Sequence, residues 1–287
     1  MANNSRQITQ RIKTTGNISK ITKAMEMVSA SKMKRSQEQA LATRPYTRAL
    51  QATLSTVASA TSASHPLLTP NFTGTDVMLL ISTDKGLCGS LNQNLFKKMI
   101  EWLKTKPNAQ IIAVGKKAVH FSRIYDVPLH AQFVELPEVL TFSDSIPITT
   151  LIQQGYISKK FKSVTVVYMD FISTLVQKVR VIDLLPIPKD QLDDGVIDPG
   201  SHAEYIFEPS AKTLLAELLP YYVENTIYQA FLEARASEHS ARMVSMKNAS
   251  ENANQLKDDL QLLFNKSRQE SITNELLDIT TASLAQA

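Results

Sequence analysis

Cysteine is almost absent from this sequence, and so are long apolar runs and the patterns of catalytic sites. Cys88 is the only cysteine, which excludes an intrachain disulfide and a cysteine zinc site, and a reducing, cytoplasm-facing compartment fits best. The longest apolar candidate is the short stretch Val77–Ile81, far below the ~18 residues that a membrane-spanning helix needs. The first residues lack the apolar core of a secretory signal. We therefore expect no direct membrane insertion.

Residue patterns that would indicate chemistry are missing as well. The five histidines are scattered without the spacing of metal ligands, and neither a nucleophile elbow nor a pair of carboxylates stands out. These histidines are His65, His120, His130, His202 and His239. The sequence therefore predicts no catalytic residue, no bound metal and no cofactor.

Glycine and proline, which cost ~1 and ~3 kcal/mol relative to alanine inside a helix, are unevenly distributed. The first 44 residues hold one glycine, Gly16, and no proline, and the last 67 residues, from Tyr221 onward, hold neither. Six of the eight glycines lie between Gly74 and Gly195. The sequence therefore predicts two helical arms, residues 1–60 and 206–287, on either side of a central domain, residues 74–200.

The arms have apolar residues at the spacing of a coiled coil. In the first arm these are Ile18, Ile21, Met25 and Val28, and in the last arm the series begins with Ile227, Phe231 and Ala234. At ~1.5 Å per residue the 67 residues from Tyr221 onward would span about 100 Å as a helix, so this helix needs a companion. We predict an antiparallel coiled coil of both arms. Pro209 suits the first turn of the second helix, whereas Pro220 should kink it or mark a false start.

The coiled-coil seam is lean. Small residues such as Ala230, Ala241 and Ala253 bury little area, so the pair is better explained as a shaft enclosed by other protein than as a free rod, although length alone could also stabilise it.

Charge is distributed asymmetrically along the chain. Ten Lys/Arg and two Glu give residues 1–48 a balance of +8, and seven Lys/Arg and twelve Asp/Glu give residues 201–287 a balance of −5. The two segments should lie against each other, against partners, or both, unless these are simply solvated faces.

The central domain alternates strand and helix patterns. Strands are predicted at residues 76–82, 110–114, 163–169 and 176–185, and helices at 90–106 and 116–124. This alternation indicates a mainly parallel, Rossmann-like sheet with crossover helices. The fold class is thus α/β with long helical arms.

The turn Ile81–Ser90 follows a strand and opens a helix, where α/β folds often bind phosphate. It matches neither a P-loop nor the dinucleotide-binding pattern, so a structural turn is favoured over a ligand site. The neighbouring Cys88 is better explained as a small buried residue than as a nucleophile.

Several long motifs resemble the gamma subunit family of F-type ATP synthase, of bacterial type. They are Ile18–Met33, Ser82–Gly89 followed by Leu91-Asn92, Ala241–Lys247 and Asn265–Leu276. The resemblance covers the whole length of the chain.

The resemblance implies a central-stalk rotor that couples proton flow to ATP synthesis or hydrolysis. The shaft would turn inside a ring of three alpha and three beta subunits, with its foot on the epsilon subunit and the membrane rotor ring, at the cytoplasmic face of the bacterial inner membrane. Lys23 and Met25 would face acidic turns of the beta subunits. Residues expected where the shaft meets the upper ring are Arg242, Gln269, Thr273 and Glu275.

Two other functions are compatible with parts of the sequence. One is a nucleotide-binding enzyme centred on Thr83–Ser90, with the arms as a dimerisation device. The other is a coiled-coil scaffold that binds nucleic acid or an anionic membrane through Lys32–Arg35. No aromatic residue for base stacking lies in residues 1–45, so an acidic protein partner is favoured over nucleic acid.

Overall fold

The structure, a computed structural model, describes residues 2–60, 65–188 and 207–284. It divides into two compact units: the first is Met1–Ala30 with Arg242–Ala287, and the second is Ser31–Ala241. Two long helices contribute to both units, α1 (Ala2–Ser59) and α6 (Ala211–Leu284). The predicted α/β fold with long helical arms is confirmed. The division into segments 1–60, 74–200 and 206–287 stays a prediction, and residues 189–206 of it lie outside the described ones.

The second unit contains a five-stranded sheet in the order β3-β2-β1-β4-β5. Its strands are β1 (Thr75–Ile81), β2 (Gln110–Val114), β3 (Leu129–Phe133), β4 (Phe161–Phe171) and β5 (Gln177–Leu185). The first four are parallel, and β5 runs antiparallel to β4 at one edge. The predicted mainly parallel sheet is therefore confirmed.

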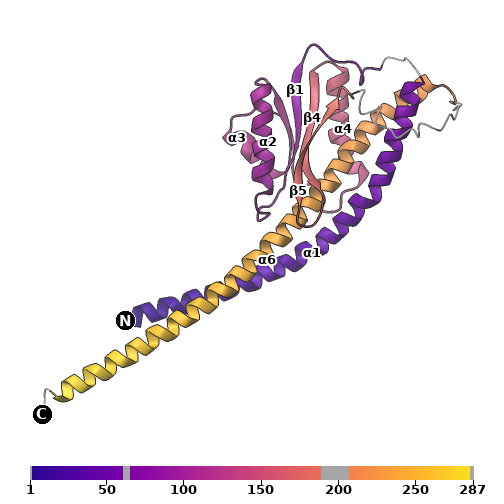
Figure 1. The fold of residues 1–287 in the computed structure, drawn as a ribbon. Coiled ribbons are helices and arrows are strands. Elements are labelled where there is room, and N and C mark those ends of the chain that lie inside the picture. Colours follow the sequence, from indigo (N-terminus) through magenta and orange to yellow (C-terminus); the bar gives the residue numbers. More distant parts are fainter. Residues whose placement is uncertain (1, 61–64, 189–206, 285–287) are drawn as a thin grey trace. The chain divides into compact units, whose positions relative to one another are not determined.

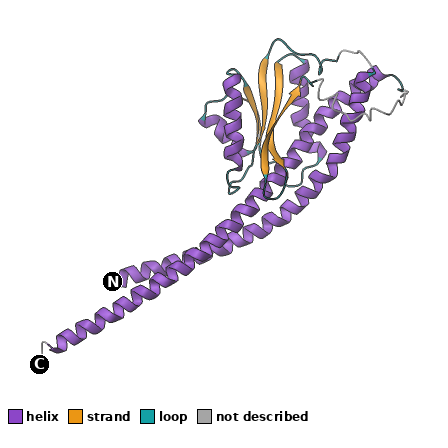
Figure 2. Cartoon of the chain, viewed as in Figure 1, coloured by secondary structure: helices purple, strands orange, loops and turns teal. Residues whose placement is uncertain are grey.

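Helices cover both faces of this sheet (Figures 1 and 2). On one face lie α2 (Leu91–Thr105) and α3 (Lys116–Ile124), which pack on Met78 and Leu80. On the other face lie α4 (Phe142–Ile157) and the parts of α1 and α6 that belong to this unit, packed on Val77 and Leu79. Alternate residues of one buried strand thus serve two cores, which explains why its sequence is apolar throughout.

Two elements were not predicted, β3 and α4. β3 is a short edge strand of five residues, two of them exposed, so it offers too few residues for a clear strand pattern. α4 contains Pro147 and several β-branched residues, which lower helix propensity. A signal for its start did exist: Thr141 and Asp144 form a capping box, with the Asp144 carboxylate accepting from the Thr141 backbone N–H at 2.8 Å.

The prolines of the arms behave differently from expectation. The placement of Pro209 in the first turn of the second helix is wrong, because α6 begins at Ala211 and Ser210 caps it by accepting from the backbone N–H of Thr213 at 3.2 Å. Pro220 does not end the helix, which continues through it. The Pro220 carbonyl also accepts a hydrogen bond from the Gln153 side chain of α4 at 2.8 Å.

Candidate partner interface

In the first unit, α1 and α6 run antiparallel, and the seam between them is made largely of small polar residues. The Ser19 hydroxyl donates to Asn254 Oδ1 at 2.7 Å, and the Ser250 hydroxyl donates to the Ser19 carbonyl at 3.4 Å. Other buried residues of these two helix segments are Ile8, Thr15, Ser29, Met246 and Ala253. The seam is therefore as lean as its small residues suggested, and its polar groups bond to one another.

The prediction that Ile18, Ile21 and Val28 lie in the seam between the two helices is wrong. Their exposed fractions are 47%, 59% and 55%, whereas Ser29 is only 3% exposed. The buried face of α1 lies one position along from the apolar series, and Met25 is only partly buried. Because small side chains let two helices approach closely, the serine and threonine face is the one that fits against α6. The large apolar side chains then point outward.

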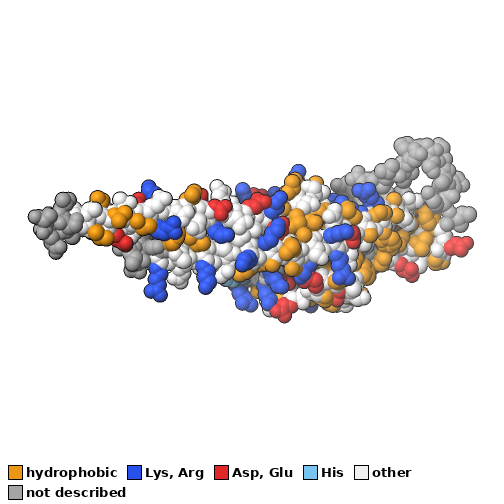
Figure 3. Space-filling model, turned by 90° about the horizontal axis from the view of Figure 1, so that it is seen from below, with side chains coloured by type: hydrophobic (Ala, Val, Ile, Leu, Met, Phe, Trp, Pro, Cys, Tyr) orange, Lys and Arg blue, Asp and Glu red, His pale blue; other side chains and the backbone are white. Residues whose placement is uncertain are grey.

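Apolar side chains are exposed on the C-terminal part of α6 as well. Leu256, Leu263, Ile272, Leu276 and Ile279 are all 49–65% exposed. The space-filling view shows exposed hydrophobic side chains among Lys and Arg side chains (Figure 3). Soluble monomers rarely expose many large apolar groups close together, so this helical pair has the surface of a protein that is covered by partners.

A shallow groove follows the helical pair beside the predicted contact residue Lys23. Three basic residues, Lys20, Lys23 and Lys247, line it together with Glu26 and Glu251. Lys23 Nζ lies 3.0 Å from the Glu26 carboxylate, but its side chain is 58% exposed. The Glu26 side chain is only 16% exposed, so the pair is partly buried, but the exposed side chain of Lys23 is accessible to an acidic group of a partner.

The predicted contact residues fall into separate places on the first unit. Lys23 and the partly buried Met25 lie on α1, near the groove. Gln269, Thr273 and Glu275 are exposed on α6, and at ~1.5 Å per residue they begin about 27 Å beyond Glu251 of the groove. Arg242 is buried within the chain, with 7% of its surface exposed. The structure thus groups Lys23 with Met25, and Gln269 with Thr273 and Glu275, but does not bring all of them together.

Side chains of the turn that follows β1 make hydrogen bonds to backbone N–H groups of α3. Ser82 Oγ accepts from the backbone N–H of Ala118 at 2.7 Å, and Asp84 Oδ1 accepts from that of Lys116 at 3.0 Å. These N–H groups of the first turn of α3 would otherwise be open to a phosphate. Phe231 and Arg235 of α6 line the small cavity above the turn. The arrangement favours the structural turn that the sequence indicated.

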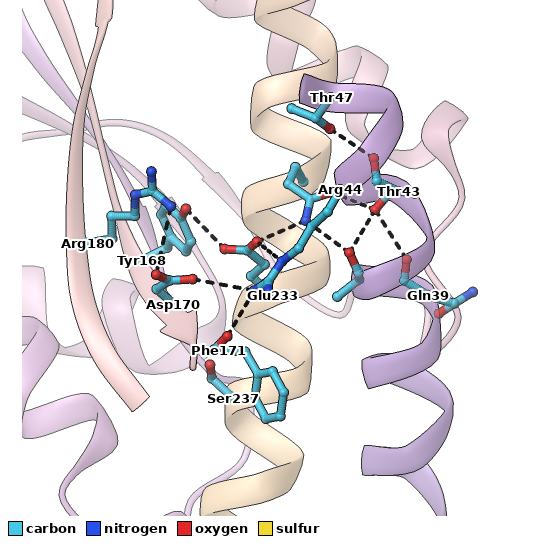
Figure 4. Close-up of polar contacts among 12 residues, drawn as sticks. Gln39, Thr43, Arg44, Thr47, Tyr168, Asp170, Phe171, Arg180, Glu233 and Ser237 are labelled. Atoms are coloured by element: carbon cyan, nitrogen blue, oxygen red, sulfur yellow. Dashed lines mark hydrogen bonds and ion pairs between the residues drawn. The ribbon is translucent and has the colours of Figure 1, made fainter. Parts of the chain in front are cut away.

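A polar cluster in the second unit was missed by sequence reasoning (Figure 4). Arg44 of α1 donates through Nε to Glu233 of α6 at 3.2 Å and through Nη2 to the Phe171 carbonyl of β4 at 2.9 Å. Glu233 also accepts from Gln229 at 2.9 Å and from the Tyr168 hydroxyl at 3.2 Å. These residues are far apart in the sequence, so only the fold reveals their association.

Within this cluster, burial and neighbouring charges shift the pKa values of Asp170 and Glu233. Burial, reinforced by the neighbouring Glu233, raises the pKa of Asp170 to about 6, against the charges of Arg180 and Arg44. Burial alone would raise the pKa of Glu233, but hydrogen bonds from Asp170 and Gln229 and the charge of Arg44 hold it below its ordinary value. Glu233 is therefore the carboxylate that stays charged, and Asp170 is the one that takes up a proton.

Within the described part of the chain, none of the helices combines the length and the apolar character needed to cross a bilayer. The same residues contain no group of His, Cys, Asp or Glu side chains arranged to hold a metal ion.

Comparisons with known proteins identify the family. The sequence profile of the ATP synthase family matches residues 4–285. An ATP synthase gamma chain of Dehalococcoides mccartyi is 41% identical over 288 residues, covering 99% of both chains. One from Glaesserella parasuis is 40% identical over 286 residues, covering 98% of this chain and 99% of its own length.

Solved structures agree in fold. A chain of the Euglena gracilis mitochondrial ATP synthase, in a structure of its OSCP, F1 and c-ring, superposes with a TM-score of 0.72 at 18% identity and covers 100% of this chain and 95% of its own. A chain of the Tetrahymena thermophila mitochondrial ATP synthase central stalk and c-ring gives a TM-score of 0.59 at 27% identity, over 80% of this chain and 99% of its own. Together with the profile match and the full-length relatives, these findings establish that the chain belongs to the ATP synthase gamma chain family, the family of the central-stalk subunit.

Proposed function

We propose that the chain is the non-catalytic rotor of a bacterial F-type ATP synthase, transmitting rotation between the membrane rotor ring and the catalytic ring of alpha and beta subunits. The observation that carries this proposal is the outward apolar face of the helical pair, with Ile18, Ile21 and Val28 exposed beside a polar seam. A shaft of this kind needs an enclosing partner to cover its apolar side chains.

The same proposal assigns contacts. Lys23 and Met25 face acidic turns of the beta subunits, which supply the negative charge that the groove of Lys20, Lys23 and Lys247 favours. Gln269, Thr273 and Glu275 contact the upper part of the ring, and Arg242 takes part through the 7% of its surface that is exposed. The epsilon subunit and the rotor ring bind the foot, at the cytoplasmic face of the inner membrane.

Such a shaft acts on the catalytic subunits by differential binding. Its faces differ in charge and bulk, so each beta subunit around it meets a different surface. A surface that binds one conformation of a beta subunit better than another shifts the equilibrium between them. Rotation then moves each beta subunit through its states in turn, and proton flow is coupled to ATP synthesis or hydrolysis.

Co-purification tests the proposal. The tagged chain, expressed with the alpha, beta and epsilon subunits of the same organism, should elute with three copies each of alpha and beta, and the complex should rotate during ATP hydrolysis. Elution of the chain without these subunits would contradict the rotor role. Titration of the isolated chain with ATP separates it from a nucleotide-binding enzyme: we expect no 1:1 binding, and tight binding would favour the enzyme.

A further inference from the structure

Arg44 occupies a junction of three elements in the second unit (Figure 4). It belongs to α1, its Nε donates to Glu233 on α6, and its Nη2 donates to the Phe171 carbonyl on β4. Asp170 of β4 lies 4.0 Å from the same guanidinium and 3.8 Å from Arg180 of β5. One planar side chain therefore connects both long helices with the sheet, through a fork of donors that a lysine lacks.

The acceptors of Arg44 are themselves fixed. Glu233 is 4% exposed and also accepts hydrogen bonds from Gln229 and Tyr168. Gln229 in turn donates to the Ala40 carbonyl of α1 at 3.2 Å and accepts from the Thr43 hydroxyl. Hydrogen bonds to a buried, ionised partner are stronger than neutral ones and fix geometry. The Arg44 side chain thus binds to a rigid frame.

Other contacts of α1 within this unit join it to α6 or to the apolar core. The Asn225 side chain of α6 donates to the Thr47 hydroxyl of α1 at 3.0 Å, beside the contacts of Gln229 with α1. Leu50, Leu54 and Val57 of α1 are buried in the core beneath the sheet, but apolar burial is non-directional, so it holds the helix without fixing its position along its axis. The ion pair of Lys32 with Glu138 is more than one-third exposed on both sides, and exposed pairs contribute little.

We propose that Arg44 is the positioning residue that fixes α1 directly to the sheet, so that torque acting on the α/β domain reaches α1 without passing through α6. This inference rests on the rotor function proposed above. α6 has its own direct links to β4, through Tyr168 and through the Ser237 hydroxyl, which donates to the Met169 carbonyl at 3.0 Å. Without Arg44, α1 retains its apolar contacts and its hydrogen bonds to α6. It loses its hydrogen bond to the Phe171 carbonyl of β4 and can shift relative to the sheet under load.

The test measures torsional stiffness in the assembled complex. The catalytic ring is attached to a surface, and a bead is attached to the α/β domain through the substitution Phe72→Cys, because Phe72 is 91% exposed and the native Cys88 is buried. With rotation stalled, the angular variance of the bead reports stiffness. Arg44→Ala should raise this variance at least twofold relative to Arg48→Ala, a matched control that removes the same charge from an exposed position one turn along α1.

Each result decides between the alternatives. Equal variance for Arg44→Ala and Arg48→Ala in assembled, rotating complexes would overturn the role of Arg44 while leaving the rotor function intact. Failure of the parental chain to assemble or rotate would instead overturn the rotor function, and the inference with it. Arg44→Lys keeps the positive charge, so it is the variant that should disturb folding least. We expect the angular variance of its bead to equal that of Arg44→Ala. A variance equal to that of the parental chain would contradict a role for the two acceptors that only arginine can bind at once. A defect in folding alone would lower the yield of complex, not the stiffness of complexes that form.

Discussion

Replacing Ile21 by serine should leave the isolated chain as stable as before but weaken its assembly with the catalytic ring. Ile21 is 59% exposed, and serine and isoleucine have similar helix propensities, so the free energy of unfolding should change by less than ~0.5 kcal/mol. Burial of a whole isoleucine side chain is worth ~1.5–3 kcal/mol, and 59% of that is roughly 1–2 kcal/mol. If the ring covers this side chain, the association constant should fall about 5- to 20-fold.

The reciprocal substitution provides the control. Ser29 is 3% exposed in the seam, so Ser29→Ile should overpack it and destabilise the isolated helical pair by ~1–3 kcal/mol. Thermal unfolding followed by circular dichroism measures the first effect, and titration of labelled ring subunits with the chain measures the second. The reasoning is refuted if Ile21→Ser destabilises the isolated chain by more than ~1 kcal/mol while Ser29→Ile does not, because the apolar series would then be the true seam.

Three further substitutions test separate features. Gly155→Ala places a Cβ against the Phe161 ring of β4 and should lower the free energy of unfolding in urea by ~1–3 kcal/mol. Gly16→Ala meets nothing closer than 4.0 Å and should raise it by up to ~1 kcal/mol; equal effects would contradict this packing. Since burial raises the pKa of Asp170 to about 6, its protonation stabilises the fold fully below the ordinary pKa, and this contribution is lost as pH rises through about 6. Asp170→Asn should remove that part of the pH dependence of the urea midpoint, and parallel profiles for both chains would exclude it. Met25→Lys adds a cation two residues from an existing lysine on a partner-facing helix and should lower the ratio of protons pumped to ATP hydrolysed; the parental ratio would rule out this contact.

The fold was largely predictable because its signals are local. Stretches without glycine or proline marked α1 and α6, and the apolar run of β1 marked a strand buried on both faces. The seam was predicted one position away because the usual rule places large apolar side chains inside. In this chain Ile18 and Ile21 face outward and Ser19 faces the partner helix, which is the arrangement expected when a second protein provides the apolar surroundings.

The polar cluster could not be predicted for a different reason. Arg44, Asp170 and Glu233 come from three elements that are remote in sequence, and each by itself resembles an ordinary surface charge. Only the pairing of helices and sheet brings them within hydrogen-bonding distance. The caps that Ser82 and Asp84 provide for α3 are likewise visible only once β1 and β2 are neighbours, although the absence of a P-loop motif had already favoured a structural turn.

The polar seam of the first unit also has a thermodynamic consequence. The heat capacity change of unfolding rises with the apolar surface that unfolding exposes, and the slope of stability against denaturant scales with the total surface exposed. Unfolding of a seam made of Thr15, Ser19, Ser29 and Ser250 exposes little apolar surface. Unfolding of the two cores, one on each face of the sheet, exposes much more. In the isolated chain the helical pair should therefore unfold broadly and with a shallow denaturant dependence, while the sheet domain unfolds in a sharp transition. Proteases acting on the free subunit would cut the arms first and leave the sheet domain.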